Sequence, residues 1–220
     1  MNESANKYYD LLASVYDKAT EAPGAWNPPS MVYETIKHKI SSQSRILDIG
    51  IGTGQSIAKI YGEGQYKEIW GVDVSTKMLD ICKEKYPKAK LTRISSVADI
   101  ENINGCFDMV ISSGVTEFIE DIDLLFKHVS CKQEKGGIFA FTYEPIIYFH
   151  PFQNDRKSLT VPNKSSSFYL NDFYTYRRNP VEISHLLDTN NFRVTEDFEF
   201  IAYKKGTEQI IYHVVVAIRV

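Results

Sequence analysis

The sequence predicts an α/β fold in which helices cover both faces of one mostly parallel sheet. Short apolar runs alternate with helical spacing along most of the chain, a glycine-rich turn joins one run to a helix, and two longer runs close the chain. Short buried strands separated by helices are typical of parallel sheets with right-handed crossovers. With 220 residues and 43% hydrophobic residues, we expect one domain over residues 1–220.

Each expected element carries a local signal. The five parallel strands are expected at Arg45 to Ile49, Ile69 to Val74, Ala89 to Ser95, Phe107 to Ser112 and Gly137 to Thr142. Helical spacing follows at Gln55 to Tyr61, after Ser75 as a cap, and at Ile122 to Ser130. Two leading helices, Tyr8 to Tyr16 and Met31 to Ile40, lie in a segment, residues 1–43, that we expect to cover the site.

The last third of the chain has a different pattern. Residues 145–179 are rich in aromatic residues, Ser and Asn without a clear period, which indicates an insertion on the substrate side. A helix from Pro180 should end at Asn190 and Asn191, because Asn tolerates the left-handed conformation. FRVTEDFEFIAY and IIYHVVVAIRV then predict an antiparallel hairpin, which completes a seven-stranded sheet.

Composition narrows the function classes. No window approaches the roughly 18 apolar residues of a membrane span, and MNESANKYYD lacks a signal-peptide pattern, so we expect a soluble, cytoplasmic protein without a membrane partner. The cysteines Cys82, Cys106 and Cys131 lack metal-site spacing, so we expect no metal. We expect all three to be buried free thiols. A net charge of -3 makes nucleic acid an unexpected partner.

The glycine-rich turn follows the first strand as RILDIGIGTGQSIAKI. Its pattern is D-x-G-x-G-x-G, from Asp48 to Gly54, and Asp73 closes the second strand. A dinucleotide fingerprint would need a third glycine at Gln55 or Ile57, and a phosphate-binding P-loop would need a Gly-Lys-Ser/Thr sequence. An acid at the end of the second strand suits hydrogen bonding to ribose hydroxyls.

At these residues the chain resembles the class I S-adenosylmethionine-dependent methyltransferases, whose fold is Rossmann-like. The resemblance runs from about Tyr8 to Val220 and includes the Gly136–Gly137 pair and the closing hairpin. The leading YYDLLASVYD resembles the small-molecule branch, in which such a helix lies over the cofactor. The resemblance implies S-adenosyl-L-methionine as cofactor and a small-molecule methyl acceptor as partner.

The resemblance also implies roles for single residues. The glycines let backbone N–H groups approach the carboxylate of the cofactor. Asp48 holds the loop and binds the methionyl ammonium, and Asp73 accepts hydrogen bonds from the ribose hydroxyls. The implied cofactor-binding set is Tyr9, Tyr16, Asp48, Gly50, Gly52, Thr53, Gly54, Asp73, Val74, Met78, Ser96, Val97 and Ser112.

Two positions depart from the family pattern. Where an acid often accepts from the adenine amino group, this chain has Ser96, with Asp99 three residues later. Adenine is then held by Ser96 and the backbone of Val97, or by Asp99. Many small-molecule members have histidine after the fourth strand, where this chain has Glu117 and Phe118.

Three residues are candidates for substrate binding: Glu117, Glu144 and His150. Glu117 could bind a cationic amine or accept a proton, or simply belong to a solvated helix start. Glu144 and His150 follow the fifth strand, where parallel strands line a ligand crevice. Aromatic residues of the insertion wall a pocket or pack a lid: Tyr148, Phe149, Phe152, Phe168, Tyr169, Phe173, Tyr174 and Tyr176.

The sequence therefore predicts an enzyme that transfers a methyl group to oxygen or nitrogen of a small molecule by in-line displacement. Alignment and exclusion of water can supply most of the acceleration, so no catalytic residue is named. The alternatives are a tRNA or protein methyltransferase, a cofactor-binding protein without catalysis, and a NAD-dependent oxidoreductase. We expect a monomer or a homodimer.

Overall fold

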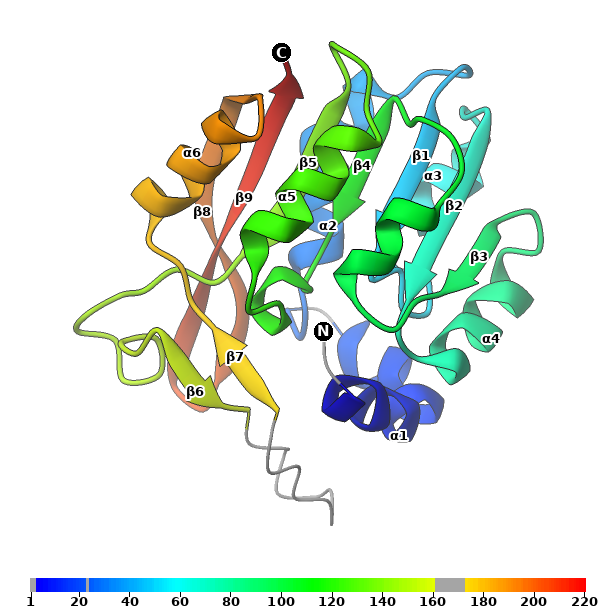
Figure 1. Ribbon diagram of the computed structural model, residues 1–220. Helices are drawn as coiled ribbons and strands as arrows, with labels where there is room; N and C mark the ends of the chain where they lie inside the picture. Colours follow the sequence, from blue (N-terminus) through cyan, green and yellow to red (C-terminus); the bar gives the residue numbers. More distant parts are fainter. Residues whose placement is uncertain (1–2, 23, 161–172) are drawn as a thin grey trace.

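The structure is a computed structural model that describes residues 3–22, 24–160 and 173–220. Figure 1 shows one large sheet with its strands side by side. Seven strands run in the order β3-β2-β1-β4-β5-β9-β8. Their bounds are β1 (Arg45–Ile49), β2 (Glu68–Asp73), β3 (Lys90–Arg93), β4 (Met109–Ser112), β5 (Ile138–Tyr143), β8 (Phe192–Lys205) and β9 (Glu208–Arg219).

The large sheet contains both parallel and antiparallel strands, as predicted. β1 to β5 pair in parallel, whereas β9 pairs antiparallel with β5 and with β8. A separate two-stranded sheet joins β6 (Lys157–Leu159) and β7 (Tyr174–Tyr176). The prediction of a seven-stranded, mostly parallel sheet with a C-terminal antiparallel hairpin is thereby confirmed.

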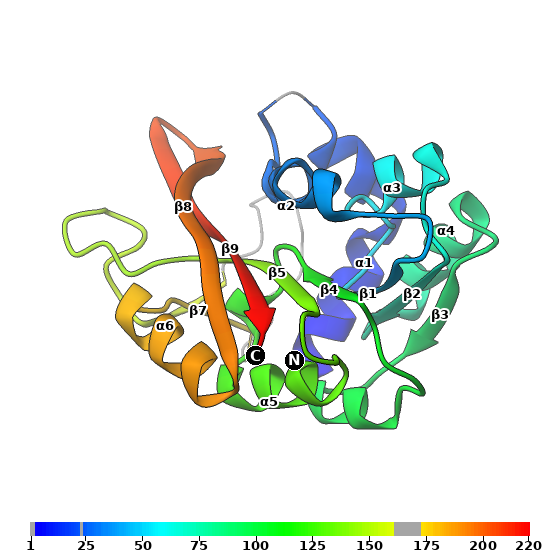
Figure 2. The ribbon, with the colours of Figure 1, turned by 90° about the horizontal axis from the view of Figure 1, so that it is seen from above.

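Helices lie on both faces of the sheet, as Figure 2 shows from above. The α-helices are α1 (Glu3–Thr20), α2 (Pro28–Ile36), α3 (Ala58–Glu63), α4 (Thr76–Lys85), α5 (Ile122–Cys131) and α6 (Pro180–Thr189). Short 3-10 helices are η1 (Lys37–Lys39), η2 (Val97–Asn102) and η3 (Thr116–Phe118). Figure 1 shows that α1 does not cover a face but lies near the ends of β1 and β2.

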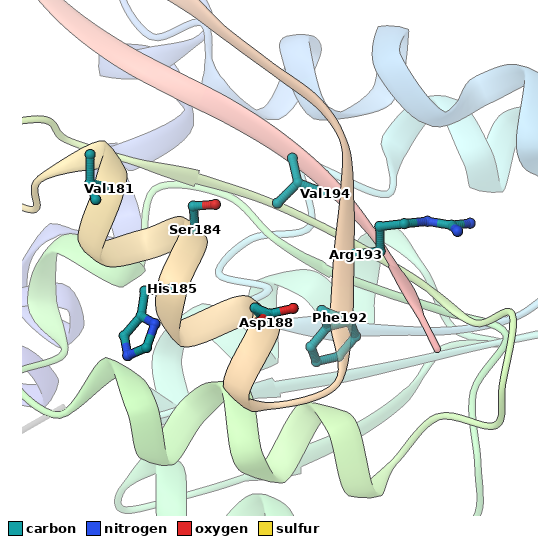
Figure 3. A pocket seen from close by; sticks show the side chains of 7 residues that line it. All are labelled: Val181, Ser184, His185, Asp188, Phe192, Arg193 and Val194. Atoms are coloured by element: carbon teal, nitrogen blue, oxygen red, sulfur yellow. The ribbon is translucent and has the colours of Figure 1, made fainter.

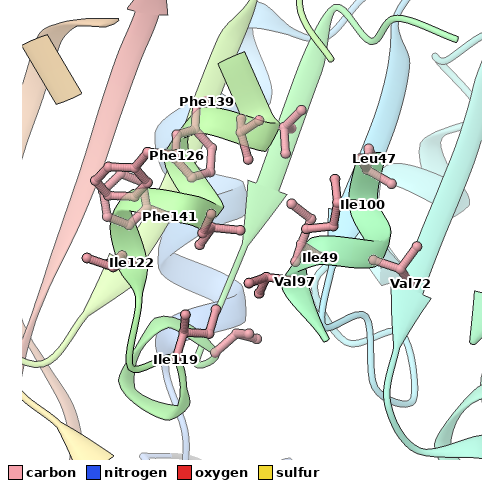
Figure 4. Close-up of a cluster of buried hydrophobic side chains, with 14 of the residues drawn as sticks. Leu47, Ile49, Val72, Val97, Ile100, Ile119, Ile122, Phe126, Phe139 and Phe141 are labelled. Carbon is pink, nitrogen blue, oxygen red and sulfur yellow. The ribbon is translucent and has the colours of Figure 1, made fainter. Parts of the chain in front are cut away.

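Two hydrophobic clusters fill the space between the sheet and its helices. Neighbouring residues of a strand point to opposite faces, so Leu47 joins the cluster under α5 and α6, whereas Ile46 joins the cluster under α2, α3 and α4. Figure 4 shows part of the first cluster, where Phe126 of α5 packs on Phe139 and Phe141 of β5. Burial on both faces explains why these strands are apolar throughout.

Most predicted elements occur where the sequence places them, with some differences. Ser75 caps α4 by accepting from the backbone N–H of Met78 at 3.1 Å, and Asn191 is left-handed with φ 62° after α6. The helix predicted from Gln55 begins only at Ala58. The insertion contains the β6–β7 pair, which the sequence does not indicate, and residues 161–172 of its predicted lid lie outside the described residues.

Two further predictions concern cysteines and the membrane. Cys82 is buried as expected, but Cys106 is half-buried and Cys131 is exposed, so the expectation of three buried thiols is wrong for these two. Among the described residues, no helix has both the length and the apolar character that crossing a bilayer requires.

Candidate functional site

The candidate site lies at the carboxyl ends of β1, β2 and β4, around the glycine-rich turn. Gly50, Gly52 and Gly54 all have positive φ, at 77°, 54° and 89°, which L side chains rarely adopt. A Cβ atom at Gly50 would lie 2.2 Å from Val115 Cγ2, and one at Gly54 would lie 2.4 Å from Tyr86 Cε2. A Cβ at Gly52 would meet no atom within 4 Å, so this glycine faces open space. Only at Gly52 does the missing side chain leave room for a ligand.

The amide groups of the turn are already used within the protein. The N–H groups of Gly50 and Ile51 donate to the Val72 carbonyl oxygen at 2.7 and 3.1 Å. The N–H of Gly52 donates to Asp73 Oδ2 at 2.9 Å. In this arrangement these three amides are therefore not free to bind an anion, which differs from the expectation for the turn. Of the three glycines, only Gly52 leaves room for a ligand to approach the backbone.

Two buried carboxylates flank the turn. Asp48 is 0% exposed, and neither of its carboxylate oxygens has a hydrogen-bond partner among the described residues. Burial, together with the charge of Asp73, raises its pKa well above the usual value. An unpaired buried carboxyl is costly, so it suits a cationic ligand group such as an ammonium.

Asp73 is more enclosed than an open strand end would be. It is 7% exposed, and it accepts from the backbone N–H of Ser75 at 2.8 Å as well as from Gly52. Burial raises its pKa, and these backbone hydrogen bonds lower it in part. Asp73 thus ties the glycine turn to the start of α4 and lines the same cavity as the turn.

Helix α1 closes the site from the side. Asp17 accepts from Thr53 Oγ1 at 2.5 Å and from Lys85 Nζ at 2.9 Å, and Asp10 accepts from Ser75 Oγ at 2.6 Å. These hydrogen bonds attach α1 both to the glycine turn and to α4. Figure 1 shows the helix lying across the ends of these elements. The YYDLLASVYD segment therefore lies against the glycine turn, and its role in covering a bound cofactor stays a prediction.

One small cavity brings much of the predicted cofactor set together. It has a volume of about 40 Å³. Its lining includes Tyr9, Tyr16, Gly50, Gly52, Asp73, Val74 and Met78, together with Ser113, Gly114, Val115 and Phe118. The cavity is thus smaller than the roughly 300 to 1,000 Å³ that ligand pockets usually enclose. Burial raises the pKa of both tyrosines, so their hydroxyl groups stay neutral.

The remaining predicted cofactor residues do not line this cavity. Ser96 forms a capping box with Asp99, whose carboxylate accepts from the N–H groups of Ser95 and Ser96 at 2.6 and 3.1 Å. Val97 is buried, and Ser112 Oγ donates to the Ile49 carbonyl oxygen at 3.0 Å. Ser96 and Asp99 are thus both occupied in capping η2, and the choice between them for adenine stays a prediction.

The turn after β4 places Glu117 deep in the protein. Its carboxyl is 1% exposed, and Oε1 accepts from the Tyr212 hydroxyl at 2.9 Å. The reading of Glu117 as part of a solvated helix start is therefore wrong, because the side chain points inward. Burial raises its pKa to about 8, although the Tyr212 hydrogen bond lowers it in part.

The other two predicted substrate residues are not brought to the cavity. Glu144 is buried and accepts from Arg177 Nε at 2.6 Å. This ion pair joins the residue after β5 to the residue after β7. The imidazole of His150 lies within hydrogen-bonding distance of the Gln209 carbonyl oxygen, at 3.0 Å, and accepts from the N–H of Phe152 at 3.1 Å, which fixes its own loop.

The aromatic residues of the insertion divide between surface and core. Tyr148 and Phe149 are exposed, whereas Phe173 is buried and stacks on Phe118 at 5.0 Å between ring centroids. Phe173 also contacts Tyr8 and Tyr9 of α1. Phe168 and Tyr169 lie outside the described residues.

Two larger hollows lie elsewhere. One, of about 300 Å³, lies between the end of α1 and α2 and is lined by Trp26, Asn27, Gln55 and Lys59 among others. The other, of about 550 Å³, lies on the surface between α6 and β8, where His185, Asp188 and Arg193 surround it (Figure 3). The second shares no residue with the cavity at the glycine turn. No group of three or more potential metal ligands occurs within the described residues.

Several residues of the site are not evident from the sequence. Asp10, Asp17, Trp26 and Tyr212 all contact predicted site residues or their turns. The acids Asp10 and Asp17 belong to the repeated Tyr-Asp pattern of α1, which is a signal that sequence reasoning could use. Trp26 and Tyr212 carry no such pattern, since their partners are far away along the chain.

Comparison with known proteins agrees with the fold and the motif. Residues 47–141 match the family described as a methyltransferase domain. The malonyl-[acyl-carrier protein] O-methyltransferase 1 of Ilyobacter polytropus is 31% identical over 119 residues, which are 53% of this chain and 44% of that protein. Carboxy-S-adenosyl-L-methionine synthase 1 of Yersinia pseudotuberculosis is 29% identical over 54% of this chain and 46% of that protein. The chain thus spans less than half the length of either relative.

Solved structures share the fold at low sequence identity. A SAM-dependent methyltransferase from Methanosarcina mazei has a TM-score of 0.71 at 14% identity, over 86% of this chain and 98% of that one. A magnesium protoporphyrin IX methyltransferase from Synechocystis, with SAH bound, has a TM-score of 0.61 at 15% identity, over 87% and 81%. The family match over residues 47–141 and the glycine motif within it make this chain similar to the class I S-adenosylmethionine-dependent methyltransferases.

Proposed function

We propose that this protein transfers the methyl group of S-adenosylmethionine to an oxygen or nitrogen atom of a small molecule. The observation that carries the proposal is the single cavity shared by Gly50, Gly52 and Asp73 beside the unpaired Asp48 carboxylate. When bound, the cofactor supplies an electrophilic methyl group on a sulfonium.

Each part of the site has a defined task in this proposal. Asp48 holds the ammonium of the methionine portion, and Asp73 accepts from the ribose hydroxyls. The open face of Gly52 permits close approach, and Val74 and Met78 offer apolar surface to adenine, which Ser96 and Val97 border. Tyr9 and Tyr16 of α1 exclude water, which in-line displacement requires.

Small acceptors are favoured over macromolecules by the enclosure of the site. The turn after β4 is covered by α1 and by Phe173, and the chain has a net charge of -3, which gives no attraction to tRNA. A carrier-linked acceptor, as the name of the Ilyobacter relative describes, would need a surface for that carrier. A location in the cytoplasm and a monomeric or dimeric state remain predictions.

The experiment is incubation with methyl-labelled S-adenosylmethionine and a fractionated cell extract. We expect label in the low-molecular-mass fraction. Label in tRNA or protein would favour a macromolecular acceptor, and binding without transfer to any fraction would favour a non-catalytic binding protein. Binding of NAD without binding of S-adenosylmethionine would overturn the proposal.

A further inference from the structure

The position of Glu117 is fixed by the strand beside it. Thr142 of β5 accepts from the N–H of Gly114 through Oγ1 at 2.9 Å, and its carbonyl oxygen accepts from Thr116 Oγ1 at 2.7 Å. Gly114 has φ 69°, and a Cβ there would lie 2.4 Å from Trp26 Cζ2. The turn that carries Glu117 is therefore held on both sides.

The Glu117 carboxyl has one partner and one free oxygen. Oε1 accepts from Tyr212, whereas Oε2 is buried without a hydrogen-bond partner among the described residues. No ion pair of the described residues includes Glu117, in contrast to Glu144, which pairs with Arg177. A buried acceptor without a partner costs stability, so such a group points to a ligand that supplies a donor.

The Tyr212 hydroxyl links this carboxyl to a group of aromatic rings. Trp26 meets Tyr212 at 5.8 Å and Tyr203 at 5.6 Å between ring centroids. On the other side of the turn, Phe118 meets Tyr9 at 5.9 Å. Aromatic faces attract cations, and an acid beside them adds a charged acceptor. The combination is suited to a cationic group.

The carboxyl also lies next to the cofactor cavity. Gly114, Val115 and Phe118, which flank Glu117 along the chain, line the same cavity as Gly50 and Asp73. Glu117 is also close enough to Tyr9 and Tyr16 for its charge to raise the pKa of both. A group held by Glu117 would thus lie next to the cavity that the cofactor would occupy.

From these contacts, and resting on the proposed function, we infer that the methyl acceptor is a small-molecule amine whose ammonium binds Glu117 between Trp26 and the tyrosines. The ammonium gives one proton to the Glu117 carboxylate. The nitrogen lone pair then forms a bond to the methyl carbon while the carbon–sulfur bond breaks and leaves its electron pair on sulfur. Charge and protons balance, because the sulfonium becomes a neutral thioether and the product amine carries the positive charge.

Other acceptors fit this pocket less well. A carboxylate acceptor would place a second acid beside Glu117, and no cation among the described residues pairs with Glu117 to offset that. A hydroxyl is a far weaker acid than an ammonium, so a carboxyl is a poor base for it. An ammonium can donate a hydrogen bond to the free Oε2 of Glu117 and can make cation–π contacts with the aromatic rings.

The titratable groups that face Glu117 come from four elements. They are Tyr9 and Tyr16 of α1, Tyr203 of β8, Tyr212 of β9 and Glu144 after β5. Burial raises the pKa of all four tyrosines, so none of them supplies a charge near neutral pH. With a pKa of about 8, Glu117 is mostly protonated at pH 7 and must lose that proton to bind an ammonium.

The test is calorimetric binding in the presence of saturating S-adenosylhomocysteine. The probes are n-hexylamine, 2-phenylethylamine and tyramine, each compared with the alcohol of the same skeleton. We expect at least one amine to bind about tenfold or more tightly than its alcohol, a difference of about 1.4 kcal/mol. At pH 7, binding measured in buffers of different ionisation enthalpy should release close to one proton.

Two variants and one control make the test specific. Glu117→Gln should abolish both the preference for the amine and the proton release. Tyr212→Phe, which keeps the carboxyl, should keep the preference. Glu120→Gln changes an exposed acid three residues away and should behave as the unsubstituted protein does.

The outcomes separate the inference from the proposed function. If S-adenosylhomocysteine binds but no amine is preferred, or if Glu117→Gln keeps the preference, the inference is wrong and the proposed function stands. If neither S-adenosylhomocysteine nor S-adenosylmethionine binds, the proposed function itself fails.

Discussion

Replacing Glu117 with glutamine should raise the free energy of unfolding by an amount that grows with pH. Glutamine has the same shape and still offers an oxygen to the Tyr212 hydroxyl, but it carries no charge. The wild-type carboxyl is 1% exposed and has its pKa raised from 4.5 to about 8 by burial. The folded state therefore favours the neutral acid, whereas the unfolded state lets it ionise.

The sign and size follow from linkage. Below about pH 4.5 the carboxyl is neutral in both states and the substitution has little effect. As the pH rises to about 8, the unfolded state loses a proton that the folded state keeps, so the wild type loses stability relative to the glutamine variant. At about 1.4 kcal/mol per pKa unit, the difference reaches about 1 kcal/mol at pH 5 and about 4 to 5 kcal/mol at pH 9.

Urea denaturation at pH 5, 7 and 9 measures this difference. Other buried acids, such as Asp48 and Glu144, are common to both proteins, so the comparison isolates Glu117. Glu120→Gln is the control: Glu120 is exposed and its contact with Lys157, at 3.2 Å, lies on the surface, so the variant should change stability by less than about 1 kcal/mol. Parallel pH profiles for wild type and Glu117→Gln would refute the reasoning, as would a variant that is less stable than wild type at pH 9.

Four further predictions concern the cofactor side of the site. Gly54→Ala should destabilise the fold by about 2 kcal/mol or more, because φ is 89° and a Cβ would lie 2.4 Å from Tyr86. Gly52→Ala should cost only about 1 kcal/mol of stability but weaken S-adenosylhomocysteine binding, because its Cβ would point into open space. Denaturation measures the loss of stability and calorimetry measures the loss of affinity. An unchanged affinity of Gly52→Ala would show that no ligand approaches there. Asp73→Asn should cost roughly 2 to 4 kcal/mol of cofactor binding by calorimetry, since an amide is a weaker acceptor for ribose hydroxyls, and unchanged affinity in a folded variant would contradict its role. Hydrogen exchange with and without S-adenosylhomocysteine should show added protection in α1 and in the insertion, whereas protection confined to the glycine turn and β2 would contradict a lid.

The local features of the fold could be predicted from the sequence because their causes are local. The bounds of β1 follow from an apolar run that ends at glycine, and the start of α4 follows from Ser75 as its cap. The left-handed Asn191 likewise needs only its own short polar side chain. The β6–β7 pair escapes prediction, since strands of three residues give no measurable period.

The contacts that complete the site depend on distant parts of the chain. Asp17 bonds Thr53, 36 positions away, and Glu117 bonds Tyr212, 95 positions away. No periodicity links such residues, so the sequence could identify Glu117 as a candidate but not its burial. For Asp73, the strand end was predictable, but its enclosure by Gly52 and Ser75 follows only from the turn geometry.

The antiparallel hairpin of β8 and β9 has a consequence for how this protein can change. Tyr203 and Tyr212 come from this hairpin and Trp26 from the connection between α1 and α2, whereas the residues that surround the cofactor cavity come from α1, the turns after β1 and β4, and the start of α4. Substitutions at Tyr203 and Tyr212 would therefore change the surroundings of the proposed acceptor site at Glu117, while the residues that line the cofactor cavity stay the same. A library that varies only positions 203 and 212 would test new acceptors without changing a residue that lines the cofactor cavity.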